Sequence, residues 1–214
     1  MKKRVNLSPI INDLLRQMFA SHIEPEQLRE LPLKGFEGPV HVIDTPEGAR
    51  AAVRRLAGEK YLGFDTETKP SFSKGKNNPV SLLQLATEKE AWLFRLNRIG
   101  HIPDLLPICA DPSILKVGAA IRDDIRLIKN LMRGEPAGFV DLQEFVPRFG
   151  IENFGLRKLA AIVLGFRISK SQQLSNWDAD HLSEPQIRYA ATDAWVSLAI
   201  YLKLISSADH GPDQ

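Results

Sequence analysis

The stretch YLGFDTET at residues 61–68 places two carboxylates, Asp65 and Glu67, at the end of an apolar run. We predict a strand over Tyr61–Thr66. Because side chains alternate across a strand, both acids project onto one face, where they repel each other unless a cation lies between them. Magnesium and manganese suit such a position, since hard divalent ions prefer carboxylate oxygens. The spacing is common, so two acids in a solvated loop are the alternative.

Around this strand, apolar runs of strand length alternate with helical patterns, which predicts a mixed α/β fold. The other predicted strands are Val40–Ile43, Val80–Thr87, Ala91–Leu96 and Leu115–Gly118. The polar turn at residues 88–90 predicts an antiparallel hairpin of two of them. Helices are predicted from Thr45-Pro46 to about Leu56, over Ile102–Ala110, and from about Ile121, Asp141, Gly155 and Ser183.

A second pair of acids, Asp123 and Asp124, lies in the helix predicted from Ile121. At about 100° per residue, the apolar stripe of this helix includes Asp124, whereas Asp123 points away from it. A carboxylate on a buried stripe is costly unless a cation or hydrogen-bond donors compensate it. Asp124 is therefore the functional candidate, and a structural acid paired with an arginine is the alternative.

The last predicted helix contains a single acid, Asp193, between Pro185 and Ala208, in a segment that is apolar on almost every face. Such a pattern is typical of a buried helix. Tyr189 stands four residues earlier, so the phenol and the carboxylate share one helix face, with side-chain bases roughly 5–6 Å apart. A core tyrosine hydrogen-bonded to its neighbour is the alternative to a functional pair.

Four carboxylates, Asp65, Glu67, Asp124 and Asp193, thus occupy improbable places for acids in separate elements. Together they suggest one site for two divalent cations, an arrangement that stabilises both the attacking and the leaving oxygen in phosphoryl transfer. Tyr189 could then hold the attacking water or the scissile phosphate in line, because a phenol is a weak base near neutral pH. The sequence predicts a metal-dependent phosphoryl-transfer enzyme.

Composition and charge exclude other classes of protein. The 214 residues carry 28 Lys+Arg and 26 Asp+Glu, a net charge of +2, and 43% are hydrophobic, which is typical of a globular chain. The single cysteine, Cys109, excludes an internal disulfide and a Cys-rich zinc site. Polar residues interrupt the apolar run that a signal peptide needs, so we expect a cytoplasmic protein, or a nuclear one in a eukaryote, with no membrane partner.

We expect three segments along the chain. Residues 1–38 form a helical N-terminal extension, in which Ser8 caps a helix starting at Pro9 and the Pro- and Gly-containing stretch Glu24–Pro39 is a connector. Residues 39–207 form the catalytic domain and residues 208–214 a disordered tail. The sequence does not identify a protein partner for the N-terminal helix.

Three motifs resemble those of a known family. Asp65-Thr66-Glu67, Val117-Gly118 with Asp124 six residues beyond the glycine, and YAATD at 189–193 resemble the exonuclease motifs of the DEDD superfamily of 3′–5′ exonucleases. A tyrosine four residues before the last aspartate indicates the tyrosine branch, because the histidine branch has its histidine five residues before, where this chain has Arg188. VSLLQLA at 80–86, GLRKL at 155–159, LG at 164–165 and SNW at 175–177 look like the Werner-type exonuclease domains, over about residues 40–205.

The resemblance implies a ribonuclease H-like α/β fold with a mixed five-stranded sheet, and stepwise release of nucleoside 5′-monophosphates from a 3′ end. It implies two Mg²⁺ or Mn²⁺ ions: Asp65 bridges both, Glu67 and Asp193 complete the tighter site, and Asp124 holds the second ion directly or through water. Tyr189 orients the nucleophile. The similarity favours DNA with a free 3′ end as the substrate, and an exoribonuclease like ribonuclease D is the alternative.

A local basic rim is needed for this substrate, because a net charge of +2 is too small to attract a polyanion over the whole surface. The candidate nucleic-acid-binding residues are Thr66, Lys74, Lys76, Arg167, Lys170 and Trp177. A nucleic-acid-binding module that has lost catalysis is a further alternative. Such loss usually shows as a replaced acid, and none of the four is replaced.

Overall fold

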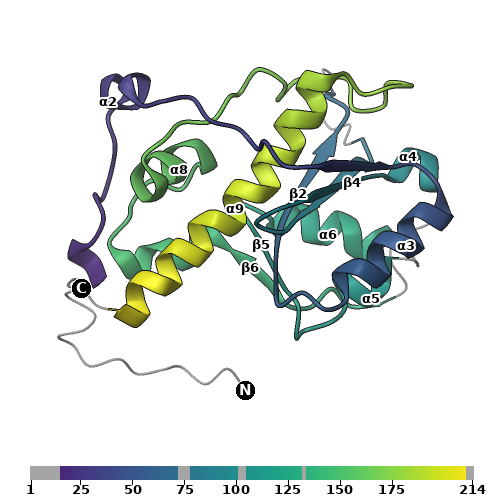
Figure 1. Ribbon diagram of the computed structural model, residues 1–214, viewed down its shortest axis with the longest axis horizontal. Coiled ribbons are helices and arrows are strands. Elements are labelled where there is room, and N and C mark those ends of the chain that lie inside the picture. The colour runs from purple at the N-terminus through teal and green to yellow at the C-terminus, as the bar shows by residue number, and fades with distance from the viewer. Residues whose placement is uncertain (1–14, 72–77, 101–104, 132–133, 211–214) are drawn as a thin grey trace.

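Six strands form one mixed sheet in the computed structural model, which describes residues 15–71, 78–100, 105–131 and 134–210 (Figure 1). Their spatial order is β1-β4-β3-β2-β5-β6. Strand β3 is antiparallel to both of its neighbours, β2 and β4, and the remaining neighbours pair in parallel. The bounds are β1 Val40–Ile43, β2 Tyr61–Thr68, β3 Val80–Ala86, β4 Ala91–Arg95, β5 Leu115–Gly118 and β6 Phe139–Asp141.

The five predicted strands are all present, and the predicted hairpin is confirmed as the antiparallel pair β3 and β4. The prediction of a five-stranded sheet is wrong, because β6 adds a sixth strand parallel to β5. This strand has only three residues and follows Gly138, whose φ is 70°. Three residues are too few to produce a recognisable alternation of polar and apolar side chains.

Helices cover both faces of the sheet (Figure 1). One face packs against α3 (Pro46–Leu56), α5 (Leu106–Cys109) and α6 (Arg122–Leu131), and the other against α8 (Leu156–Leu164) and the long α9 (Glu184–His210). Short helices complete the chain: α2 Pro25–Glu30, α4 Leu96–Ile99, α7 Leu142–Phe145 and the 3₁₀ helix η2 Val146–Phe149. None of the helices within the described ranges is long and apolar enough to cross a membrane.

The sequence signals for helix ends hold where the structure describes them. The Thr45 side chain accepts a hydrogen bond from the Gly48 amide at 3.1 Å and Pro46 is the first residue of α3, as predicted. The helix predicted over Ile102–Ala110 is observed as the single turn α5, while residues 101–104 lie outside the described part of the chain. The last helix extends to His210, so residues 208–210 are helical rather than part of a tail.

The close approach of α9 to β2 requires a glycine. A Cβ atom on Gly63 would lie 1.9 Å from the carbonyl oxygen of Ala194 in α9. Because Gly63, Asp65 and Glu67 share one face of β2, the helix that touches Gly63 brings its own Asp193 beside the two strand acids.

The segment before β1 packs against α9 and the loop before it. Most of the helix predicted from Pro9 lies outside the described residues, and α2 occupies part of the predicted connector. The Lys34 amide donates to the Arg167 carbonyl at 2.9 Å, and the Phe36 amide donates to Thr192 Oγ1 at 2.9 Å. The side chain of Arg188 donates to the carbonyls of Phe36 and Gly38 at 3.2 and 3.1 Å. These contacts tie residues 34–38 to α9 and to the loop before it.

Candidate active site

Three of the four predicted acids meet between β2 and α9. Ligand-capable oxygens of Asp65, Glu67 and Asp193 all lie within 4.8 Å of one another. The two strand acids are half-buried, whereas Asp193 is 7% exposed. The expectation that alternation places Asp65 and Glu67 on one face is confirmed, since both face the same helix residue.

Tyr189 reaches the same region from α9, one turn before Asp193. Its hydroxyl interacts with the Asp193 carboxylate, and its ring lies 6.0 Å from the ring of Trp177. Trp177 is completely buried, so it supports the Tyr189 ring and does not offer its own ring to nucleic acid. The start of α9 is fixed by Gln186, whose Oε1 accepts from the Ser183 amide at 2.9 Å.

The fourth acid, Asp124, approaches from the opposite side of β2. It lies in the first turn of α6 and accepts a hydrogen bond from the Thr66 hydroxyl. Asp124 is not one of the three acids within 4.8 Å, but its charge raises the pKa of both Asp65 and Glu67. Asp123 is exposed and pairs with Arg126 at 3.2 Å, as the helical phase predicts.

The turn that delivers Asp124 depends on Asp141, a residue whose role here was not predicted. Its carboxylate accepts from the amides of Ala120 and Ile121 at 2.9 and 3.1 Å, and also from Gln143 at 2.9 Å. Ala120 has a φ of 61°, which is uncommon for a residue other than glycine. An aspartate at the start of a predicted helix is a signal for a helix cap, which Asp141 forms on α7, but this signal does not indicate the second contact.

Burial raises the pKa of every acid in the cluster, and repulsion from the other acids of the cluster raises the pKa of the two strand acids further. For both strand acids, loss of solvent contact is the main cause of the raised pKa, and repulsion from Asp193 adds to it. The pKa of Asp65 lies well above its usual range, and the pKa of Glu67 rises to about 9. Burial raises the pKa of Asp193 to about 7 despite the Tyr189 hydrogen bond, and it also raises the pKa of Asp124. No ion pair within the described ranges neutralises any of these acids.

The residues fit a divalent cation. Among the described residues, no positive charge neighbours the three converging carboxylates and no group forms a hydrogen bond with the buried Asp193 Oδ1. A hard cation bound by these oxygens would remove the repulsion that now raises their pKa values. Burial and the nearby acids also raise the pKa of Tyr189, so its hydroxyl stays protonated near neutral pH and acts as a donor rather than a base.

The other predicted nucleic-acid-binding residues are dispersed. Thr66 is 9% exposed and bonded to Asp124, and Arg167 Nε donates to the Leu31 carbonyl at 3.0 Å, so both hold parts of the fold in place. Lys170 is exposed in the loop before α9. Lys74 and Lys76 lie outside the described residues.

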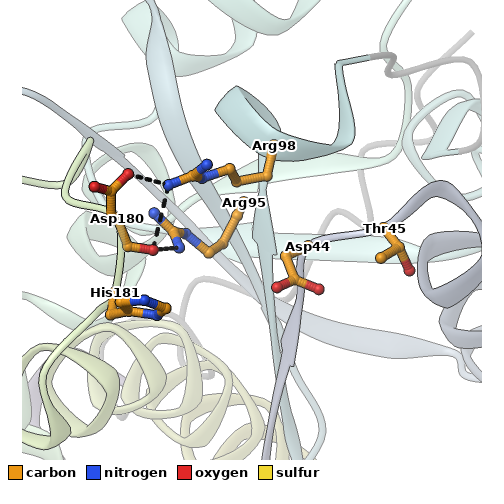
Figure 2. Close-up of a pocket in the computed structure, with 6 residues that line it drawn as sticks. All are labelled: Asp44, Thr45, Arg95, Arg98, Asp180 and His181. Atoms are coloured by element: carbon orange, nitrogen blue, oxygen red, sulfur yellow. Dashed lines mark hydrogen bonds and ion pairs between the residues drawn. The ribbon is translucent and has the colours of Figure 1, made fainter.

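A pocket of about 510 Å³ is lined by none of the predicted site residues. Figure 2 shows the residues that line it. Arg95, at the end of β4, is 4% exposed and donates to the backbone carbonyls of Ala179 and Asp180, and Arg98 donates to the Asp180 carboxylate. The arginines therefore hold the loop that connects Trp177 to α9. Because carboxylates balance the arginines, the cavity has little net charge; its lining residues are Asp44, Thr45, Arg95, Arg98, Asp180 and His181.

Comparison with known sequences identifies relatives over most of the chain. Exonuclease 3′-5′ domain-containing protein 2 of Drosophila melanogaster is 37% identical over 149 residues, which cover 68% of this chain and 25% of that protein. Ribonuclease D of Gluconacetobacter diazotrophicus is 33% identical over 80% of this chain and 43% of that protein. The mouse bifunctional 3′-5′ exonuclease/ATP-dependent helicase WRN is 32% identical over 72% of this chain and 12% of that protein. The chain thus spans less than half the length of these relatives.

The fold also matches a solved nuclease domain. The exonuclease domain of Aedes aegypti Nibbler superposes with a TM-score of 0.72 at 28% identity, covering 83% of this chain and 93% of that domain. The resemblance to DEDD exonucleases and the ribonuclease H-like fold class are therefore confirmed. Residues 40–208 match the family model described as 3′-5′ exonuclease, and the chain belongs to this family of enzymes.

Proposed function

We propose that this chain removes nucleotides one at a time from the 3′ end of nucleic acid, using two divalent cations held by Asp65, Glu67, Asp124 and Asp193. The observation that carries the proposal is the convergence of three half-buried or buried acids within 4.8 Å, with no compensating positive charge among the described residues. Such a cluster is costly in a folded protein unless a cation completes it. Membership of the exonuclease family supports the class of reaction, and the acidic cluster supports the location of the active site.

The four acids have different positions and therefore different proposed roles. Asp65, Glu67 and Asp193 hold one cation, and Asp124, on the opposite side of Thr66, holds the second together with Asp65. Bound Mg²⁺ or Mn²⁺ would generate hydroxide from water and stabilise the leaving oxygen. The chain's own contribution is to fix these oxygens in a partly dry site between β2 and α9.

Tyr189 is proposed to orient the attacking water or the scissile phosphate, which places the enzyme in the tyrosine branch. Its hydroxyl is protonated because its pKa is raised by burial and by the neighbouring acids, so it donates a hydrogen bond. The packing of its ring against the buried Trp177 restricts where that donor can point.

We propose DNA as the preferred substrate, on the strength of the Werner-type motifs and the WRN relative. The alternative is an exoribonuclease. The similarity to ribonuclease D, which covers 80% of this chain, supports this alternative. Discrimination depends on whether the pocket accepts a 2′-hydroxyl at the 3′ end.

Matched DNA and RNA oligonucleotides, single-stranded and with recessed 3′ ends, test the proposal directly. We expect a ladder of products shortened from the 3′ end in Mg²⁺ or Mn²⁺, release of nucleoside 5′-monophosphates, and no reaction with EDTA. The variants Asp65→Ala and Asp193→Ala should fold and be inactive. Full activity in either variant would contradict the cation site, while faster degradation of RNA would reverse the substrate assignment only.

A further inference from the structure

Gln84 is a buried amide that lacks hydrogen bonds. It lies in the middle of β3, is 0% exposed, and neither its Nε2 nor its Oε1 has a partner among the described residues. A buried amide without partners is unfavourable, so such a group in a folded protein calls for an explanation. Because no part of Gln84 reaches the surface, contact with a nucleic acid substrate does not provide one.

The sheet register places Gln84 beside the acidic cluster. Gln84 is the direct antiparallel partner of Asp65, and residues directly opposite each other on neighbouring strands project to the same face, with Cβ atoms about 4.5–5.5 Å apart. The amide therefore faces α9, as the strand acids do, and not the core on the opposite face of the sheet.

The neighbours of Gln84 along β3 locate it relative to α9. Leu82 packs in one apolar cluster with Ala190, and Ala86 packs in another with Ala194. Gln84 lies between these two contacts on the same face of the strand. The turn of α9 between Ala190 and Ala194 is the one that carries Asp193, so the amide and this carboxylate approach the same space.

Asp193 offers the complementary unpaired atom. Its Oδ1 is buried and has no hydrogen-bond partner among the described residues, whereas the Asp65 carboxylate interacts with the backbone of Thr66. A buried donor on β3 and a buried acceptor on α9 thus lie at the same sheet–helix interface, each without a partner among the described residues.

We propose that Gln84 is a positioning residue of the cation site, and that in the cation-bound protein its Nε2 donates to Asp193 Oδ1. This inference rests on the proposed function, because it assigns the bond to the cation-bound state. Groups that hydrogen-bond to metal ligands fix the orientation of those ligands, and removing them typically weakens metal binding 10- to 100-fold.

Titration of the EDTA-treated and dialysed protein with Mn²⁺ alone, by calorimetry, tests the inference without substrate. Gln84→Met keeps the length of the side chain and removes both polar atoms, and Gln84→Asn keeps the amide but withdraws it by one methylene. The matched control is Ser81→Ala: Ser81 lies on the same strand, is 1% exposed and also has an unpartnered polar atom, but it is not the register partner of Asp65 or Glu67.

We expect both Gln84 variants to raise the Mn²⁺ Kd about 10- to 100-fold, with a metal-free melting temperature no lower than that of the parent. Ser81→Ala should bind Mn²⁺ like the parent.

A change in Kd smaller than about fivefold, or a loss of affinity matched by Ser81→Ala, would overturn the inference. A lower metal-free melting temperature in both Gln84 variants, or failure of both to fold, would also overturn the inference, because the inference assigns no hydrogen bond to the amide in the metal-free protein. If the parent itself binds no Mn²⁺, or Asp65→Ala binds it equally well, the proposed function fails instead.

Discussion

At the scale of single residues, Tyr189 combines two kinds of contact that can be separated by substitution. Its ring packs on Trp177, and its hydroxyl interacts with Asp193. Tyr189→Phe keeps the first and removes the second. We expect a single-turnover rate lower by about 10- to 1000-fold, the scale of one lost transition-state contact, with little change in melting temperature. A loss of about 1 kcal/mol of stability with an unchanged rate would instead identify a structural hydroxyl.

The neighbours Asp123 and Asp124 offer a matched pair of substitutions. Asp124 faces Thr66, whereas Asp123 is exposed beside Arg126. We expect Asp124→Asn to lower the rate constant by about 100-fold or more, because it removes a proposed cation ligand next to the reacting phosphate. Asp123→Asn should stay within about twofold of the parent, since an exposed ion pair contributes little. The reverse order of activities would show that the second cation is not held from α6.

At the scale of elements, the site depends on how closely one helix crosses one strand. The Cβ of an alanine at position 63 would collide with the Ala194 carbonyl, which belongs to the backbone and has no rotamer to change. Gly63→Ala should therefore push α9 outward, cost about 1–3 kcal/mol and weaken Mn²⁺ binding by separating Asp193 from Asp65. Gly58→Ala is the control, because its added Cβ meets nothing within 4 Å. Urea unfolding and Mn²⁺ titration of both variants measure the effect, and equal stability of the two would contradict it.

The sequence allowed long elements to be predicted better than short ones. The 27-residue α9 and the hairpin β3–β4 consist of apolar runs long enough to recognise, so both were predicted. The alternation of side chains along β2 predicted the shared direction of Asp65 and Glu67. The six-residue α2 and the three-residue β6 have too few positions to show a period. Gln84 lies inside an unbroken apolar strand, and only the pairing with Asp65 reveals which helix it faces. Trp177 was assigned to nucleic acid because burial of an aromatic residue in a loop cannot be read from its neighbours.

At the scale of the whole molecule, the acidic cluster makes the metal-free protein sensitive to alkali. The folded-state pKa values of Glu67 and Asp193, about 9 and about 7, lie above their ordinary values of 4.5 and 3.8. The folded protein thus binds more protons than the unfolded chain, and the free energy of unfolding should fall as pH rises from about 5 to 8. Above this window the buried Lys116, whose pKa is lowered to about 8, acts in the opposite direction.

Thermal melts between pH 5 and 8, with EDTA and with Mn²⁺, measure this dependence. We expect the metal-free melting temperature to decline across the window, and the stabilisation by Mn²⁺ to grow as the pH rises, because protons and the cation compete for the same oxygens. Asp193→Asn should flatten the metal-free profile. A melting temperature that rises across the window in EDTA would contradict the raised pKa values.

The attachment of residues 36–38 to α9 means that the unit recognisable by sequence is smaller than the unit that folds. The family match begins at residue 40, yet Arg188, directly before Tyr189, and Thr192, directly before Asp193, form hydrogen bonds with the backbone of residues 36–38. A chain trimmed to start at Val40 would lose these three hydrogen bonds to the part of α9 that carries the proposed nucleophile-orienting group. We expect such a trimmed chain to lose protection from amide hydrogen exchange first around residues 188–193. Exonuclease activity would then be lost under conditions in which the sheet is still folded.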